Sequence, residues 1–194
     1  MARTSQQHLD DEILDHAAAL FARRGFSNTS IQAVADALGY SKSGLLHHYS
    51  TKFALYDAVI SRCRTQAQGV LDEVSAMPVG DTRDRVAVTL VVEMALDNPG
   101  IAALLISPRE EVATELDEIS TMLYAAFGDT PDGPITARLI RITGGLAAVA
   151  VIALNITTSH DKARWRSLII STGLGALGHP YAEPLPTTSN DLEV

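Results

Sequence analysis

Cysteine is almost absent from this chain, aromatic residues are few, and no apolar run is long enough to cross a bilayer. Cys63 is the one cysteine among 194 residues, which excludes an intramolecular disulfide and fits a reducing cytoplasm. The most apolar run, 142–156, is shorter than the roughly 20 residues of a membrane-spanning helix. Residues 1–14 lack the apolar segment of a secretory signal peptide. We therefore expect a cytoplasmic protein without a membrane partner, and a buried helix at 142–156.

Sequence motifs of catalysis and metal binding are also missing. The chain has no phosphate-binding loop, no H-E-x-x-H segment and no Ser, His and Asp order typical of hydrolases. His47 and His48 are adjacent, but neighbouring residues of a helix point about 100° apart and do not converge on one ion. We therefore predict no metal and no cofactor. An enzyme with its active site in an acidic helical domain is a remote alternative.

The chain is instead rich in apolar helix-forming sequence, and its charge is uneven. Apolar residues make up 46% of the chain, which is enough for a substantial core. The net charge is −8, but residues 1–65 hold seven Lys and Arg against six Asp and Glu, while residues 66–194 hold eight against seventeen. A small footprint on nucleic acid needs only a few local cations. The acidic total therefore does not exclude a DNA-binding first third.

Residues 29–38 predict a short amphipathic helix. Thr29 and Gln32 have the spacing of a capping box, in which two side chains satisfy the first backbone amides. Apolar side chains then recur at i, i+3, i+4 and i+7, which defines one buried face: Ile31, Val34, Ala35 and Leu38. Gly39 ends the helix, because the left-handed residue that follows a helix is least costly as glycine.

A second short helix is predicted from about Ser41, its N-cap, to Tyr49. Leu45 and Tyr49 form its inner face, and the other faces carry Lys42, Ser43, His47 and His48. Two such helices joined by a glycine turn are a helix-turn-helix, which predicts DNA binding. Lys42 and Ser43 open the second helix, where side chains reach base edges in the major groove. An ordinary solvated helix start is the alternative.

Helical sequence continues along the rest of the chain, with no convincing strand and no internal repeat. The further predicted helices span about 10–24, 53–76, 82–97, 100–106, 108–127, 135–157 and 160–178. Residues 1–9 are expected to be a frayed arm. We predict an all-α fold of about nine helices: a helix-turn-helix domain at 1–52, a larger effector-binding and dimerisation domain at 53–178, and a disordered tail at 179–194.

Over about residues 10–60 the chain resembles the TetR family of bacterial transcriptional repressors. The matching positions are Phe21, Gly25-Phe26, Thr29-Ser30-Ile31, Val34-Ala35, Gly39-Tyr40-Ser41, Leu45, His48-Tyr49 and Lys52. Leu46 departs from the tyrosine usual in the family, and Gly44 stands where a side chain often faces the groove. Tyr49 replaces a phenylalanine. The resemblance thus implies the mode of DNA binding more firmly than the residues that read the bases.

The resemblance also implies residues that touch the DNA backbone. Ser30 and Lys52 match phosphate-contacting positions, and His48 matches a histidine that faces the backbone, with His47 beside it. Thr29 either shares the phosphate contact or only caps its helix, and Tyr40 either packs or touches phosphate. The complete predicted DNA-binding set is Thr29, Ser30, Tyr40, Ser41, Lys42, Ser43, Gly44, His47, His48 and Lys52.

In the family, helices five to eight enclose an effector pocket. The candidate lining residues here are apolar: Met94, Leu104, Leu105, Met122, Leu123, Phe127, Leu139 and Ile142. Their character predicts a lipophilic small-molecule effector. A solid hydrophobic core is the alternative at each of these positions.

The last two predicted helices are rich in small residues. Glycine costs about 1 kcal/mol in a helix interior, so this many glycines indicate a need for close packing. The family forms a four-helix bundle from these helices of two subunits. We therefore expect a homodimer interface at Gly144, Ala148, Leu168, Gly173, Leu174 and Leu177, with an intramolecular core as the alternative.

Together, these features predict a cytoplasmic bacterial transcriptional regulator, most simply a repressor. It would bind a pseudopalindromic double-stranded DNA operator as a homodimer and be released by a small lipophilic effector. A dimeric DNA-binding protein without an effector is the alternative.

Overall fold

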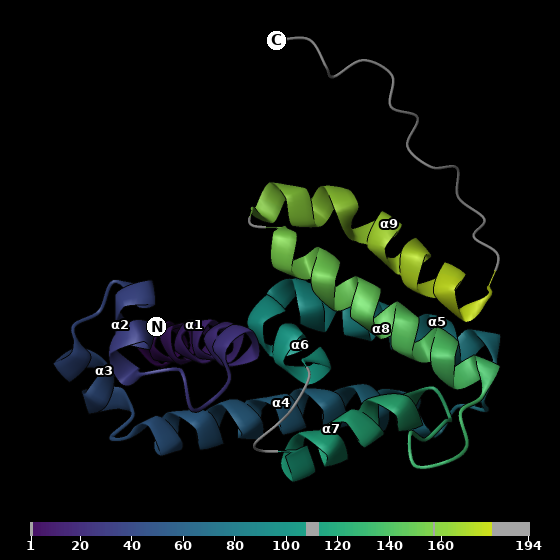
Figure 1. The fold of residues 1–194 in the computed structure, drawn as a ribbon. Helices are drawn as coiled ribbons and strands as arrows, with labels where there is room; N and C mark the ends of the chain where they lie inside the picture. Colours follow the sequence, from purple (N-terminus) through teal and green to yellow (C-terminus); the bar gives the residue numbers. More distant parts are fainter. Residues whose placement is uncertain (1, 108–112, 157, 180–194) are drawn as a thin grey trace.

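The structure is a computed structural model that describes residues 2–107, 113–156 and 158–179, and its regular secondary structure is entirely helical (Figure 1). The described residues form nine helices: α1 (Ala2–Arg24), α2 (Ile31–Leu38), α3 (Lys42–His48), α4 (Lys52–Ser75), α5 (Asp81–Asp97), α6 (Pro99–Ile106), α7 (Ala113–Ala126), α8 (Ala137–Asn155) and α9 (Ser159–Leu177). The predicted all-α class is confirmed. Residues 108–112 of the predicted helix 108–127 lie outside the described residues.

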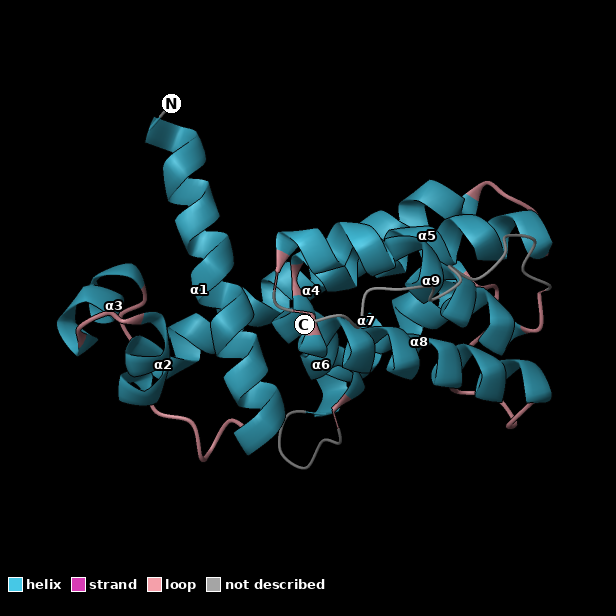
Figure 2. Cartoon of the chain, turned by 90° about the horizontal axis from the view of Figure 1, so that it is seen from above, coloured by secondary structure: helices cyan, strands magenta, loops and turns pink. Residues whose placement is uncertain are grey.

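The helices form two groups that α4 connects. Helices α1 to α3 lie at one end of the molecule, α4 runs from them along its length, and α5 to α9 form the larger group (Figure 1). In the view of Figure 2 the N-terminal end of α1 projects away from the rest of the chain. The predicted frayed arm is wrong for residues 2–9, because α1 already begins at Ala2. This segment contains no glycine or proline, so nothing in it stops the helix from extending backwards.

One hydrophobic core passes through both groups of helices. In the first group, six apolar or aromatic side chains are buried or packed against the core: Phe21, Phe26, Val34, Leu38, Leu45 and Tyr49. Helix α1 also packs against α4 and α6, so the first group is not a separate unit of packing. The division into domains at residue 52 therefore stays a prediction about the sequence.

Helix α6 begins at a sharp corner and lies directly against α1. The axes of α5 and α6 differ by 115°, and Asn98, the residue before α6, makes no capping hydrogen bond with its side chain. The carboxylate of Asp15 in α1 takes that role and accepts a hydrogen bond from the amide of Ile101. A Cβ atom added to Gly100 would lie 2.0 Å from the carbonyl oxygen of Asp15. Only glycine fits at this crossing of two backbones.

The C-terminal end of α9 is held by a buried ionic cluster. Asp84 in α5 is fully buried and accepts two hydrogen bonds from Arg138, at 2.9 and 3.2 Å. Nε2 of His179 lies 2.8 Å from the same carboxylate, and its Nδ1 lies 2.8 Å from Asp81. The predicted disordered tail is therefore wrong at residue 179, and its remainder, 180–194, lies outside the described residues.

Helix α8 is long and apolar enough to cross a membrane by length and composition, and so are α5 and α6 if the bent pair is counted as one span. This finding covers the described residues. The packing of α8 accounts for its composition differently, because the helix lies against α5, α6 and α9. One face of α8 thus serves a core, whereas Val151 and Leu154 are exposed, so the helix predicted at 142–156 is buried on one side only.

Candidate nucleic-acid interface and effector cavity

Helix α2 supports the interface and is capped one residue later than predicted. Its N-cap is Ser30, whose hydroxyl accepts a hydrogen bond from the amide of Ala33 at 3.0 Å. Gly39 ends the helix in the left-handed conformation, with φ of 70°, as predicted. The amide of Tyr40 then donates to the carbonyl of Ala35, which completes the hydrogen bonding of a glycine-terminated helix.

Thr29 is neither a cap nor a surface residue, which corrects both of its predicted roles. Its side chain is buried, with 1% of its surface exposed, and its hydroxyl donates to the carbonyl of Gly25 at 2.8 Å. Gln32 donates to the side chain of Asp36 instead of reaching back to the cap. Thr29 therefore fixes the connection between α1 and α2, because a buried hydroxyl must find a partner inside the protein.

Helix α3 presents one polar face and buries the opposite one. Ser41 is its N-cap and accepts from the amide of Gly44 at 3.0 Å, as predicted. Leu45 is fully buried, whereas Lys42, Ser43 and His47 are exposed. A helix held by one fully buried leucine keeps the exposed side chains in fixed directions. Lys42 and Ser43 lie in the first turn, the part of a recognition helix that reaches base edges.

Gly44 and Tyr40, two residues of the predicted DNA-binding set, both have contacts inside the protein. A Cβ atom on residue 44 would lie 3.2 Å from the capping hydroxyl of Ser41, so the cap favours the absence of a side chain. Tyr40 is half-buried and packs against the core, which is one of the two roles considered for it. The side chain expected to face DNA is therefore missing at residue 44 for a reason internal to the helix.

The two adjacent histidines point in different directions. His47 is exposed, whereas His48 is half-buried and its Nδ1 lies 3.8 Å from the carboxylate of Asp10 in α1. Within the part of the chain that the structure describes, no group of three metal-binding side chains comes together. Tyr49 lies beside them, and its burial, together with the charges of Asp10 and Asp11, raises the pKa of its hydroxyl.

Lys52, which we predicted to contact a phosphate, is engaged inside the protein. Its Nζ donates to the carbonyl oxygen of Phe26 at 2.8 Å and lies 4.1 Å from the centre of the Phe26 ring. The N-cap of α4 is Thr51, whose hydroxyl accepts from the amide of Ala54. In this conformation Lys52 ties the start of α4 to the loop after α1. The charge stays near the predicted interface, but it is already partly satisfied.

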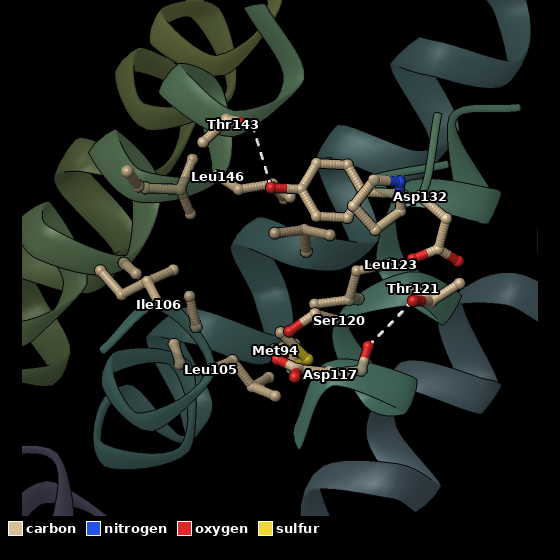
Figure 3. Close-up of a pocket in the computed structure, with 18 residues that line it drawn as sticks. Met94, Leu105, Ile106, Asp117, Ser120, Thr121, Leu123, Asp132, Thr143 and Leu146 are labelled. Atoms are coloured by element: carbon tan, nitrogen blue, oxygen red, sulfur yellow. Dashed lines mark hydrogen bonds between the residues drawn. The ribbon is translucent and has the colours of Figure 1, made fainter. Parts of the chain in front are cut away.

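A cavity of about 430 Å³ opens between α5, α6, α7 and α8 (Figure 3). Its apolar lining is Val91, Met94, Ala95, Ala102, Leu105, Ile106, Leu123, Leu146, Ala147, Val149 and Ala150, with Pro131 at the edge. Its polar lining is Asp117, Ser120, Thr121, Tyr124, Asp132 and Thr143. This volume lies in the range of small-molecule sites.

Three of the eight residues predicted for an effector pocket line this cavity, and five do not. Met94, Leu105 and Leu123 face the cavity. The others do not line it: Leu104, Met122, Phe127, Leu139 and Ile142. Phe127 and Ile142 border a void of only about 10 Å³, because the packing of α5 against α8 and α9 closes that part of the core. The sequence prediction missed the polar side, although α7 carries polar residues at i, i+3, i+4 and i+7 from Asp117 to Tyr124.

The small residues of α8 and α9 serve mainly to pack these two helices inside one subunit. Gly173, Leu174 and Leu177 are buried in the chain itself, which corrects their assignment to a dimer surface. A Cβ on Gly173 would lie 2.9 Å from Val88. The predicted interface residues that remain accessible are Gly144, Ala148 and Leu168. The prediction missed three exposed apolar side chains on α8: Ile140, Val151 and Leu154.

Comparisons with known proteins agree with this geometry. Residues 13–59 match the family described as bacterial regulatory proteins, tetR family. The uncharacterized HTH-type transcriptional regulator Rv1255c of Mycobacterium tuberculosis is 29% identical over 134 residues, 66% of this chain and 66% of that protein. The HTH-type transcriptional repressor KstR2 of Rhodococcus jostii is 41% identical over 49 residues, 25% of this chain and 24% of that protein.

Among solved structures, the probable transcriptional regulatory protein RHA5900 covers 84% of this chain and 97% of its own, with 20% identity and a TM-score of 0.49. The two sequence relatives are described as transcriptional regulators. The matched segment spans the helix-turn-helix whose caps, glycine turn and buried leucine are described above. Residues 13–59 therefore resemble the helix-turn-helix segment of the tetR family of bacterial regulatory proteins.

Proposed function

We propose that this protein is a homodimeric transcriptional repressor that binds a pseudopalindromic operator and is released by a small molecule. The observation that carries the proposal is the face of α3, where Lys42, Ser43 and His47 are exposed above a fully buried Leu45. Side chains in these positions reach the edges of bases when the helix lies in a major groove. Ser30 and Ser41, exposed at the starts of α2 and α3, are candidates for contacts to phosphate.

The outer face of α8 supports the proposal of a dimer. Ile140 and Val151 are 61% and 52% exposed, and Gly144 has no atom near the position of an added Cβ. At 3.6 residues per turn, Ile140, Gly144 and Val151 share one face of the helix. An apolar stripe of this kind needs a partner, and a second copy would place two recognition helices on one duplex.

The cavity favours a regulator with an effector over the alternative, a dimer that binds DNA without one. Helix α6 contributes Ala102, Leu105 and Ile106 to the cavity, and its first turn rests on Asp15 of α1. A ligand that displaced α6 would therefore shift α1 and the helices packed on it. Coupling of this kind between two sites changes DNA affinity only if the ligand prefers one arrangement.

Footprinting on the DNA that flanks the gene, followed by gel shifts with the protected duplex, tests the proposal. We expect protection of a site with two-fold symmetry and half-sites separated by about one helical turn. Equal affinity for the protected duplex and for a shuffled duplex, at the same salt concentration, would contradict it.

A further inference from the structure

The cavity between α5 and α8 has two chemically different sides. In Figure 3 the side chains of Leu105, Ile106 and Leu146 lie on one side, and those of Asp117, Thr121 and Asp132 lie on the other. The polar side comes from α7, from the loop before α8 and from Thr143 of α8, and its two aspartates are exposed. The apolar side is thus the inner wall apart from Ile106, which is 37% exposed, and the two aspartates of the polar side face solvent.

Three hydroxyl groups of the lining, those of Thr121, Tyr124 and Thr143, already donate their protons within the protein. Thr121 donates to the carbonyl of Asp117 at 2.9 Å, and Thr143 donates to the carbonyl of Leu139 at 2.8 Å. The hydroxyls of Tyr124 and Thr143 lie 2.9 Å apart. Because Thr143 has given its only proton to the helix, Tyr124 is the donor in that bond. The hydroxyl oxygens of Thr121 and Tyr124 can therefore only accept further hydrogen bonds.

The charged groups on this side also favour a ligand that donates hydrogen bonds. Asp117 and Asp132 are carboxylates, which accept hydrogen bonds and carry negative charge at neutral pH. Within the described lining there is no Lys, Arg or His side chain. A ligand with its own carboxylate or phosphate would meet like charges and no cationic side chain in the described lining. A ligand with an ammonium group would meet several acceptors at once.

We propose, resting on the function proposed above, that the effector is a lipophilic amine. Its apolar body would lie against the inner wall formed by α5, α6 and α8. Its protonated amine would donate to Asp132 and to the hydroxyl oxygens of Thr121 and Tyr124. The class of ligand therefore follows from the acceptors and negative charges of the lining, and not from the apolar surface alone.

Three probes with the same apolar chain test the ligand class: decylamine, decanol and decanoate. Binding to the full-length protein is measured by isothermal titration calorimetry at pH 7, and release of the operator is measured in parallel. We expect decylamine to bind at least tenfold more tightly than decanol, and decanoate to bind most weakly. Added salt should weaken the binding of decylamine and leave that of decanol nearly unchanged.

Asp132→Asn is the matched variant, because residue 132 is exposed in a loop and its substitution should leave the fold intact. We expect it to weaken decylamine about two- to fivefold, the range for an exposed ion pair, and to leave decanol unchanged. Asp129→Asn is the control, since Asp129 lies in the same loop outside the cavity lining. Thr121→Trp, which fills the cavity from its open side, should abolish binding of every probe.

The outcomes separate the two proposals. If decanol or decanoate binds as tightly as decylamine, the ligand class is wrong, while an effector site remains. If no probe binds to the natural protein, or if a probe binds the Thr121→Trp variant equally tightly, the inference about the cavity fails. Operator binding can still be observed in either case. If decylamine binds in the cavity without releasing the operator, the amine site stands and the proposed release mechanism fails.

Discussion

The carboxylate of Asp15 accepts a hydrogen bond from the backbone amide of Ile101, at 3.0 Å. One residue belongs to the helix that supports the DNA-binding helices, and the other to the first turn of a helix that lines the cavity. An acidic side chain at a helix N-terminus satisfies amides that have no partner inside the helix. The two ends of the proposed switch therefore meet where the first turn of α6 lies against α1.

Asp15→Asn should be at least as stable as the natural protein at neutral pH. Burial raises the pKa of the Asp15 carboxyl, so the folded protein binds this proton more tightly than the unfolded chain does. The associated stability is present below the usual pKa and is lost as pH rises through the higher folded value. Asparagine keeps an oxygen for Ile101 and removes the charge. Urea unfolding at several pH values measures the change.

Asp15→Leu is the companion variant, because leucine has a similar volume and cannot accept a hydrogen bond. We expect it to cost about 1–2 kcal/mol of stability, the value of a lost helix cap. If the asparagine and leucine variants were equally unstable, the acceptor role of Asp15 would be wrong.

Gly100→Ala should force α6 away from α1. The added Cβ would lie 2.0 Å from the carbonyl oxygen of Asp15 and 2.9 Å from the amide of Ala19, and these backbone atoms cannot turn aside. We expect a loss of about 1–3 kcal/mol from overpacking and a changed operator affinity in gel shifts. Gly69→Ala is the control, since nothing lies within 4 Å of its added Cβ. That change should be neutral or slightly stabilising.

Lys42→Ala should weaken operator binding and leave stability unchanged. Lys42 is exposed in the first turn of α3, and loss of a base contact costs about 1–3 kcal/mol of binding free energy. Gel shifts at several salt concentrations check this expectation. Arg164→Ala removes the same charge from an exposed position of α9 and should have no comparable effect. Equal losses in the two variants would show that only the overall charge matters.

Val151→Glu should dissociate the proposed dimer. Val151 is 52% exposed on the outer face of α8, and burying an unpaired carboxylate between two subunits is strongly unfavourable. Sedimentation velocity should show a monomer that retains its helical circular dichroism. Thr65→Glu, on the exposed side of α4, is the control. A Val151→Glu protein that sediments like the natural one would place the dimer contact elsewhere, or remove it.

Arg138→Met should be far more costly than Arg85→Met. Arg138 pairs with the fully buried Asp84, whereas Arg85 pairs with Asp81, whose side chain is 56% exposed. Loss of the first partner leaves a buried carboxylate with His179 as its main remaining partner, and we expect about 2–3 kcal/mol. Loss of the second should cost less than about 1 kcal/mol. Thermal unfolding of both variants distinguishes them.

The helix-turn-helix was predictable because its signals are local. Gly39 and Ser41 mark the end of one helix and the start of the next. Leu45 is apolar, and its burial fixes the inner face of the second helix. Thr29 was misassigned for a reason that is not local. Thr29 and Ser30 are both residue types that cap helices. Thr29 is buried by packing against α1, and Ser30 forms the cap instead.

The cavity and the packing of the last helices were less predictable. Residues such as Phe127 and Leu123 are equally apolar, and only the arrangement of helices decides which of them faces an open space. Small residues likewise indicate close approach without saying to which helix. Gly173 approaches Val88 of its own chain, whereas Gly144 faces outward. Lys52 shows the same limit, because its long side chain can turn to Phe26.

The contact between Gly100 and the backbone of α1 also limits how this protein can be re-engineered. Regulators with new specificities are often designed by joining the DNA-reading part of one protein to the sensing part of another. Here a hybrid made at residue 52 would set α1 against a foreign helix. Any side chain at the position of Gly100 would collide with Asp15 and Ala19. A working hybrid would need α1 and α6, or at least the first turn of α6, to come from the same protein.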